Sequence, residues 1–141
     1  MNDKNLTEAY IQEKEKRDTI NLNIRISDDK DFKKEPYILV IKSFKENCAR
    51  LTLYPIKISN LIKISLSGIN IPNDAIKELA RLFQDFEIIH TSGLLQKGNE
   101  FYYECYLNFS ISDTKTKLLE TSLNKIKKIF KVIKIEEIGL R

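Results

Sequence analysis

The order of secondary structure predicted for the C-terminal half of the chain most constrains what it can fold into. Residues 61–67 alternate between apolar and polar side chains, with Ile62, Ile64 and Leu66 on one face, which is typical of a β-strand with one buried face. Apolar residues then recur at helical spacing over 73–86, which predicts an amphipathic helix. The six elements expected here are, in chain order, a strand at 61–67, a helix at 73–86, strands at 87–95 and 100–109, a helix at 113–130 and a strand at 131–138.

The expected faces of these elements complete the prediction of the fold. The first helix has a core-facing stripe at Ile76, Leu79, Ala80 and Phe83. The strand at 100–109 divides into a more apolar face for the core, Phe101, Tyr103, Cys105, Leu107 and Phe109, and a second face, Tyr102, Glu104, Tyr106 and Asn108. The second helix and the last strand add Leu119, Ser122, Leu123, Ile126, Ile129, Phe130, Ile133 and Ile135 to the core. This βαββαβ order predicts a ferredoxin-like α+β sandwich, an antiparallel sheet with two helices on one face.

The first 60 residues are expected to form an appendage made of a short helix and a three-strand β meander. Its elements are a surface helix within 3–18, a half-buried strand at 19–27, a polar loop at 27–31, a strand at 36–44 covered on both faces, a tight turn at 45–47 and a returning strand at 48–58, in which Pro55 marks an edge or bend. A meander of this size is too small to hold a core alone, so we expect it to pack on, or extend, the C-terminal sheet. The predicted division is therefore 1–60 and 61–141, joined near Ser59 and Asn60.

Composition argues for a cytoplasmic protein without catalytic chemistry. The net charge of +4 permits a nucleic-acid partner but does not demand one. The two cysteines, Cys48 and Cys105, are far apart, and neither a secretory signal nor an apolar run long enough to span a bilayer is evident. A lone His90 offers no base–nucleophile pair and no metal cluster, and no phosphate-binding glycine motif appears. We therefore expect a non-enzyme with no cofactor and no metal, in which His90 is packed or hydrogen-bonded.

The loop at 67–74, between the first strand and the first helix, is the best candidate for a ligand site. Gly68 would let the backbone turn sharply, and Pro72 followed by Asn73 or Asp74 as N-cap predicts a helix start. The exposed N–H groups of a helix N-terminus attract a carboxylate or another anion. The alternative is that these residues serve only as a turn and a cap, as Ser112 or Asp113 should for the second helix.

Residues 61–140 resemble the ACT domain, a small regulatory βαββαβ module that commonly binds amino acids. The resemblance rests on element order, on the loop from Gly68 to Pro72, and on an apolar strand leading into an amphipathic helix; Asn73 stands where that family often has glycine. It implies a ligand-sensing function and a homodimer with an amino acid bound between subunits. The ligand-binding residues it implies are Gly68, Ile69, Asn70, Asn73 and Asp74.

Two other functions use the second face of the sheet. Tyr102 and Tyr106, beside Lys63 and Lys134, would resemble the aromatic platform on which RNA-binding domains stack bases. Alternatively, the N-terminal meander or another subunit covers this face, and the chain is a structural protein-interaction subunit. We expect no membrane partner.

Overall fold

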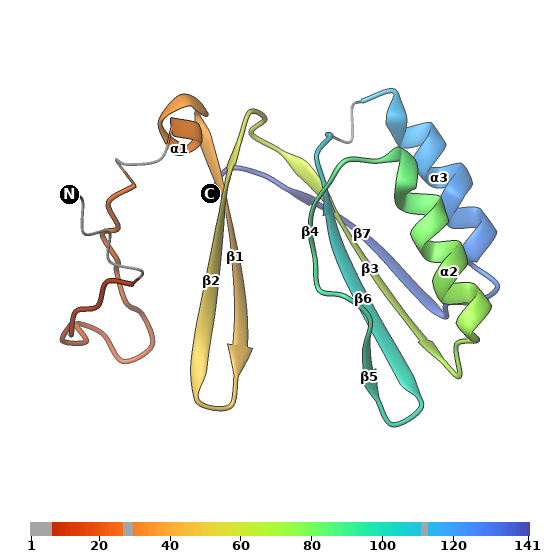
Figure 1. Cartoon of the computed structure of the whole chain (residues 1–141), viewed down its shortest axis with the longest axis horizontal. Helices are drawn as coiled ribbons and strands as arrows, with labels where there is room; N and C mark the ends of the chain where they lie inside the picture. The colour runs from red at the N-terminus through yellow and green to blue at the C-terminus, as the bar shows by residue number, and fades with distance from the viewer. Residues whose placement is uncertain (1–6, 27–29, 111–112) are drawn as a thin grey trace, which may run out of the picture.

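The described residues of the chain form an α+β fold with two antiparallel sheets and three α-helices (Figure 1). The computed structural model describes residues 7–26, 30–110 and 113–141. The elements are α1 (Lys30–Lys34), β1 (Tyr37–Lys45), β2 (Cys48–Ile56), β3 (Leu61–Ile69), α2 (Asn73–Leu82), a 3-10 turn (Phe83–Asp85), β4 (Ile88–Thr91), β5 (Leu95–Lys97), β6 (Glu100–Leu107), α3 (Lys115–Ile126) and β7 (Val132–Ile138). None of the described helices is long and apolar enough to cross a membrane.

The five-strand sheet has the order β4–β6–β3–β7, with β5 paired beside β4 on the same edge of β6. All of its pairings are antiparallel, and the helices follow β3 and β6 as the sequence predicts. One predicted strand, at 87–95, is instead broken into β4 and β5, and β4 itself has a register shift between Ile88 and His90. The gap between the predicted strands, 96–99, narrows to a turn at Gly98 and Asn99, where Gly98 takes the positive φ of +62° that a two-residue hairpin turn favours.

The principal core lies between this sheet and the helices α2 and α3, which cover one face together (Figure 1). The predicted faces of β3 and β6 are confirmed: the core contains Ile62, Ile64, Leu66, Cys105 and Leu107. The stripe of α3 is also confirmed, with Ile129 half-buried, but that of α2 is partly wrong, since Ala75 is buried and Ala80 is exposed. On β7, Ile133 is half-buried and Ile135 is exposed because this strand lies at the sheet edge.

The hairpin β1–β2 covers part of the opposite face of the sheet. Its strands pair from Tyr37 with Ile56 to Lys45 with Cys48, which confirms the predicted tight turn. Leu39 and Ile41 are buried together with Leu61, and partly buried Tyr54, Ile56, Ile58, Ile89, Tyr106 and Ile138 pack around them. The expectation that the appendage packs on the sheet is thus confirmed for the hairpin only, since residues 7–25 are exposed. The expectation that β1 is covered on both faces is wrong, since Val40 on its outer face is 52% exposed.

The chain before the hairpin differs from prediction. Residues 7–26 form neither helix nor strand, so the three-strand meander is a two-strand hairpin. The apolar stripe predicted within 3–18 is too narrow to bury, and the alternating segment 19–26 has no pairing strand in the described chain, so Ile20, Leu22 and Ile24 remain exposed. The five-residue helix α1 was not predicted; it begins within the predicted polar loop, at Lys30, and continues to Lys34. Some predictions fall outside the described residues: those for residues 3–6 and 27–29, and the alternative cap Ser112 of the second helix.

Candidate functional site

The loop between β3 and α2 is shaped by close packing at Gly68. A Cβ atom at this position would lie 2.5 Å from Cδ1 of Ile71 and 3.3 Å from the carbonyl oxygen of Ile129. The backbone of Gly68 does not take a positive φ, so the prediction that this glycine makes a sharp turn is wrong. Glycine fits this position because a Cβ would force Cδ1 of Ile71 to shift and would crowd the Ile129 carbonyl.

Asn70 makes the turn instead. Its φ of +54° is in the left-handed region, which asparagine tolerates better than most residues. Its backbone N–H donates a hydrogen bond to the carbonyl oxygen of Asn99, with an N···O distance of 2.9 Å. The loop is therefore tied to the β5–β6 turn, and the role of Asn70 shown here is conformational.

Asn73 and Asp74 begin α2 as exposed residues. The N-cap is Pro72, with no side-chain hydrogen bond, so the prediction that Asn73 or Asp74 is the N-cap is wrong. Asp74 still complements the positive end of the helix from its first turn. At the start of α3 the N-cap is Thr114, and the predicted Asp113 accepts a hydrogen bond from the backbone N–H of Lys115 at 3.1 Å.

A pocket of about 190 Å³ lies where the loop leaves β3. Its lining consists of Ser67, Gly68, Ile69, Glu100, Tyr102 and Lys131. The structure thus brings Gly68 and Ile69 to a pocket, whereas Asn70, Asn73 and Asp74 are outside its described lining. Sequence reasoning missed Glu100 and Lys131. The strand register, which pairs Ile69 with Glu100 and Ser67 with Tyr102, brings Glu100 there.

The pocket places the carboxylate of Glu100 and the ammonium group of Lys131 beside the ring of Tyr102. The hydroxyl of Tyr102 donates a hydrogen bond to the carboxylate of Glu100. This hydrogen bond raises the pKa of the Tyr102 phenol, so the phenol stays a neutral donor at physiological pH. A carboxylate and an ammonium group at one pocket match a ligand that carries both charges.

On the second face of the sheet, Lys63, Glu104 and Tyr106 form one cluster. The ammonium group of Lys63 pairs with the Glu104 carboxylate and lies 5.5 Å from the centre of the Tyr106 ring. Partial burial acts to lower the pKa of Lys63, but the hydrogen bond to Glu104 and the neighbouring Tyr106 outweigh it and raise the pKa. Lys63 is therefore a fixed cation that is already paired.

His90 joins the hairpin to the sheet. Its Nδ1 atom lies 2.6 Å from the hydroxyl oxygen of Tyr54, within hydrogen-bond distance. Its ring meets those of Tyr54 and Tyr106 edge-on, with ring centres 5.5 and 6.1 Å apart. His90 is thus packed and hydrogen-bonded, as the sequence analysis expects.

The hairpin covers one tyrosine of the predicted aromatic platform and leaves the other exposed. Tyr106 is half-buried in the hairpin contact, whereas Tyr102 is 37% exposed. Lys134 is exposed and pairs with Glu136 at 3.2 Å. The expectation that the N-terminal strands cover the tyrosines holds for Tyr106 but not for Tyr102.

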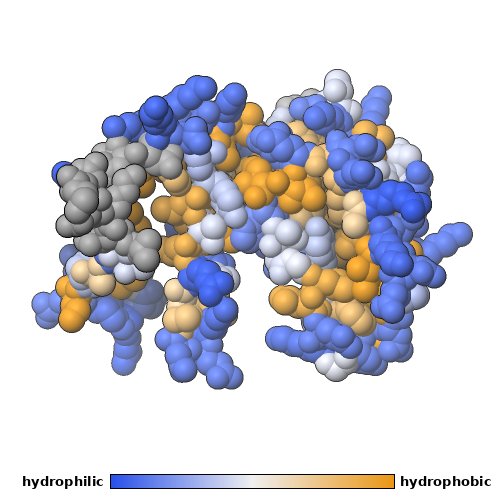
Figure 2. All heavy atoms as spheres, in the orientation of Figure 1, coloured by the Kyte–Doolittle hydropathy of each residue, from blue (hydrophilic) through white to orange (hydrophobic). Residues whose placement is uncertain are grey.

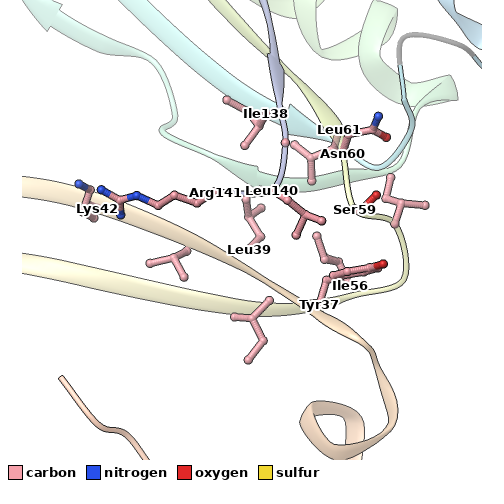
Figure 3. Close-up of a pocket in the computed structure, with 14 residues that line it drawn as sticks. Tyr37, Leu39, Lys42, Ile56, Ser59, Asn60, Leu61, Ile138, Leu140 and Arg141 are labelled. Atoms are coloured by element: carbon pink, nitrogen blue, oxygen red, sulfur yellow. The ribbon is translucent and has the colours of Figure 1, made fainter. Parts of the chain in front are cut away.

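Two larger hollows lie where the hairpin meets the sheet. One, of about 470 Å³, is at the base of the hairpin, and apolar side chains from both sheets and the C-terminal residues line it (Figure 3). The other is a groove of about 520 Å³ between the outer half of the hairpin and the sheet, and Figure 2 shows the surface hollowed there. Its charged and aromatic lining includes Lys42, Phe44, Lys45 and Arg50 of the hairpin, and Lys63, His90, Glu104 and Tyr106 of the sheet.

The two cysteines differ in exposure, and the described residues contain no cluster of metal ligands. Cys105 is fully buried, and burial raises the pKa of its thiol to about 12, which keeps it neutral. Cys48 is exposed, and the two cysteines are not bonded to each other. Among the residues that the structure describes, no group of three or more His, Cys, Asp or Glu side chains could hold a metal ion.

The coordinates show an α+β protein with antiparallel sheets. A search with protein-family models and with curated proteins found no match to this chain.

Proposed function

We propose that the protein is a non-catalytic, ligand-sensing module that binds a small zwitterion, such as an amino acid, in the pocket lined by Ser67, Gly68, Ile69, Glu100, Tyr102 and Lys131. The observation that carries the proposal is the pairing of one carboxylate with one ammonium group at a pocket beside the first loop. The setting is the cytoplasm, in keeping with two unpaired cysteines.

Support for an ACT-like, ferredoxin-like unit comes from the strand order. The first and third strands of the unit, β3 and β6, are central, and β4 and β7 are outer strands. Both helices lie on one face. This is the arrangement expected of a βαββαβ sandwich.

The charges of the pocket favour a zwitterion over a simple ion. The ammonium group of a bound amino acid would face Glu100, and its carboxylate would face Lys131. A ligand with only one of these charges would leave the like-charged pocket side chain beside it, which costs affinity. Tyr102 supplies an aromatic wall for the ligand side chain.

The proposed assembly is a homodimer that forms beside this pocket. In the described chain, no strand pairs with the outer edge of β7, and Lys131 of the pocket directly precedes β7. An unpaired edge strand offers backbone N–H and C=O groups to a second copy. Pairing there would bring a partner next to Lys131, so that ligand and dimer could influence each other.

A thermal-shift and calorimetric screen of the twenty amino acids tests this function. A ligand that binds only the native state raises the melting temperature by mass action. We expect one amino acid to do so, and Glu100→Gln or Lys131→Met to weaken it at least tenfold. The matched variants Glu87→Gln and Lys128→Met, which change exposed residues outside the pocket, should leave binding unchanged. No shift with any amino acid would contradict the proposal.

A second candidate function, a structural interaction subunit, is favoured by the outer face of the hairpin. Cross-strand pairs there join Ile38 with Pro55, Val40 with Leu53 and Phe44 with Ala49. This face is apolar except at Lys42, which pairs with Leu51, and exposed apolar patches of this kind mark protein–protein contacts. If Val40→Asp lowers the solution mass from dimer to monomer while no amino acid binds, the interaction role replaces the sensing role.

A further inference from the structure

We propose that residues 19–26 of a second copy of this chain pair as a β-strand with the free edge of β1, and that the exchange is mutual in a symmetric dimer. The apolar side chains of the segment would fill the hollow of about 470 Å³ at the base of the hairpin. This contact goes beyond the proposed amino-acid binding, because the lining of the hollow shares no residue with that of the amino-acid pocket.

The segment 19–26 has the pattern of a half-buried strand but no neighbour to pair with. Ile20, Leu22 and Ile24 alternate with polar residues and are 55%, 43% and 50% exposed. Within the described chain, the segment belongs to neither sheet and to neither core cluster. An alternating segment gains a buried face and backbone partners only by joining a sheet. The segment is therefore a strand that lacks a sheet within its own chain.

The edge of β1 offers the missing hydrogen-bonding groups. In the described chain, β1 pairs only with β2, in a hairpin closed by a two-residue turn. The pair that flanks such a turn, Lys45 and Cys48, is a hydrogen-bonded pair, and hydrogen-bonded and open pairs alternate along the two strands. The N–H and C=O groups of Ile38, Val40 and Lys42 consequently point away from β2, to the free edge.

The other edge of the hairpin is less suited to pairing. Pro55 is opposite Ile38, so it takes one of the outward positions of β2, and proline has no N–H to donate. The sequence of β1 contains no proline. The hairpin thus presents one complete edge, that of β1.

The hollow beside this edge matches the apolar face of the segment. Its lining is mostly apolar, and Leu39 of β1 points into it from one side and Leu61 and Ile138 from the other (Figure 3). Side chains of an added strand that face the sheet would enter this hollow, because neighbouring strands share their two faces. The segment extends over about 27 Å at about 3.4 Å per residue, which matches the length of β1.

A second copy is the occupant that the arrangement favours. Figure 1 shows residues 7–26 on the side of the hairpin away from the five-strand sheet, whereas the hollow is lined from the sheet side. The segment of the same chain would have to pass around the start of β1, where α1 leads into the strand. In a symmetric pair each segment reaches only to the other copy, and the two identical contacts close the assembly.

Sedimentation equilibrium of the full chain and two variants tests the exchange. Leu22→Asp puts a charge on the apolar face of the segment, and Val40→Pro removes an N–H from the edge of β1. Each variant spoils one of the two surfaces, so each alone should self-associate at least about a hundredfold more weakly than the wild type. Leu22 lies outside every described helix and strand, so Leu22→Asp cannot act by unfolding the hairpin.

Mixing the two variants separates exchange between copies from pairing within one chain. The segment of the Val40→Pro copy and the edge of the Leu22→Asp copy are both intact. The equimolar mixture should therefore associate at least about tenfold more tightly than either variant alone. A dimer held elsewhere, such as along β7, would associate equally in all three samples.

Matched variants and a local readout complete the test. Asn23→Asp adds the same charge to the polar face of the segment, and Leu53→Pro, opposite Val40 in the register, removes an N–H from the edge of β2. Both should associate like the wild type. Amides of residues 20–26 should be protected from hydrogen exchange at high protein concentration and lose protection on dilution, while β3 and β6 stay protected in every variant.

Four results would overturn the proposal. They are a monomeric wild type, variants that associate as tightly as the wild type, a mixture no tighter than the single variants, and protection of 20–26 that is independent of protein concentration. Glu100→Gln and Lys131→Met should not change this protection. Loss of amino-acid binding with intact exchange therefore contradicts only the proposed function, and the reverse contradicts only this inference.

Discussion

The two faces of the five-strand sheet are covered in different ways. The helix-covered face is uniformly apolar, and Ile62, Ile64 and Leu107 are completely inaccessible to solvent. The opposite face carries Lys63, Glu104 and Tyr102, and the hairpin covers only the end near Leu61. One face therefore stabilises the fold, whereas the other leaves polar groups beside hollows.

The largest expected effect is on the helix-covered face. Ile64→Ala removes three buried carbon atoms from the centre of β3, and we expect a loss of about 2–5 kcal/mol in the free energy of unfolding. Ser65→Ala, one residue further on the same strand but on the other face, should change it by less than about 0.5 kcal/mol. Urea denaturation of both variants measures the contrast, and equal losses would contradict it.

The next effect should be confined to the hairpin. Leu39→Ala removes a buried contact with the sheet, so we expect the hairpin to open more readily, at a cost of about 2–3 kcal/mol. Hydrogen exchange should speed up in β1 and β2 while β3 and β6 stay protected. Uniform loss of protection across all strands would show that the two sheets unfold as one unit.

Gly68→Ala should cost about 1–2 kcal/mol, because the new methyl group would overlap Ile71 and crowd the Ile129 carbonyl. Gly139→Ala is the control, since its Cβ would meet no described atom within 4 Å. The double variant Gly68→Ala/Ile71→Val removes Cδ1 of residue 71 and should lose less than the sum of the single variants. Strict additivity, measured by thermal unfolding, would contradict the contact.

The last effect is absent at neutral pH and appears only as a slope of stability with pH above 9. Burial raises the pKa of Cys105 from 9.0 to about 12, so the folded state keeps a proton that the unfolded state releases. The stabilisation is complete below pH 9 and is lost as pH rises towards 12, at up to about 1.4 kcal/mol per pH unit. Cys105→Ala should flatten the fall in stability above pH 9 relative to Cys48→Ala, as measured by urea denaturation at several pH values.

The elements with one clear periodicity could be predicted from the sequence. The strand carrying Ile62, Ile64 and Leu66 and the α3 stripe with Leu119 and Ile126 are where they were expected, because local pattern and tertiary burial agree. The prediction of a strand at 19–27 was wrong for the described residues 19–26, and the reason is physical. A strand needs a hydrogen-bonding neighbour, and the pattern of one segment does not reveal whether a neighbour exists.

The candidate pocket shows the same limit. The first loop was found through glycine and proline, which act locally, so Gly68 and Ile69 were identified. Glu100 and Lys131 were missed because only strand register and the path into β7 bring them to the loop. Asn70 was expected to touch a ligand, but the structure shows it making a backbone turn. Asparagine is common in turns because it tolerates the left-handed conformation, so the sequence alone does not separate this role from ligand binding.

The hairpin contacts the sheet near one of its ends only, so it can act as a lever. Its fulcrum is the contact of Leu39 and Ile41 with Leu61, and its free arm runs from there to the turn after Lys45. That arm is about 20 Å long at about 3.4 Å per residue, so a rotation of about 10° at the fulcrum displaces the tip by about 3–4 Å. The hydrogen bond between Tyr54 and His90 sits close to the fulcrum. Small changes at this joint are therefore magnified into the opening of the groove.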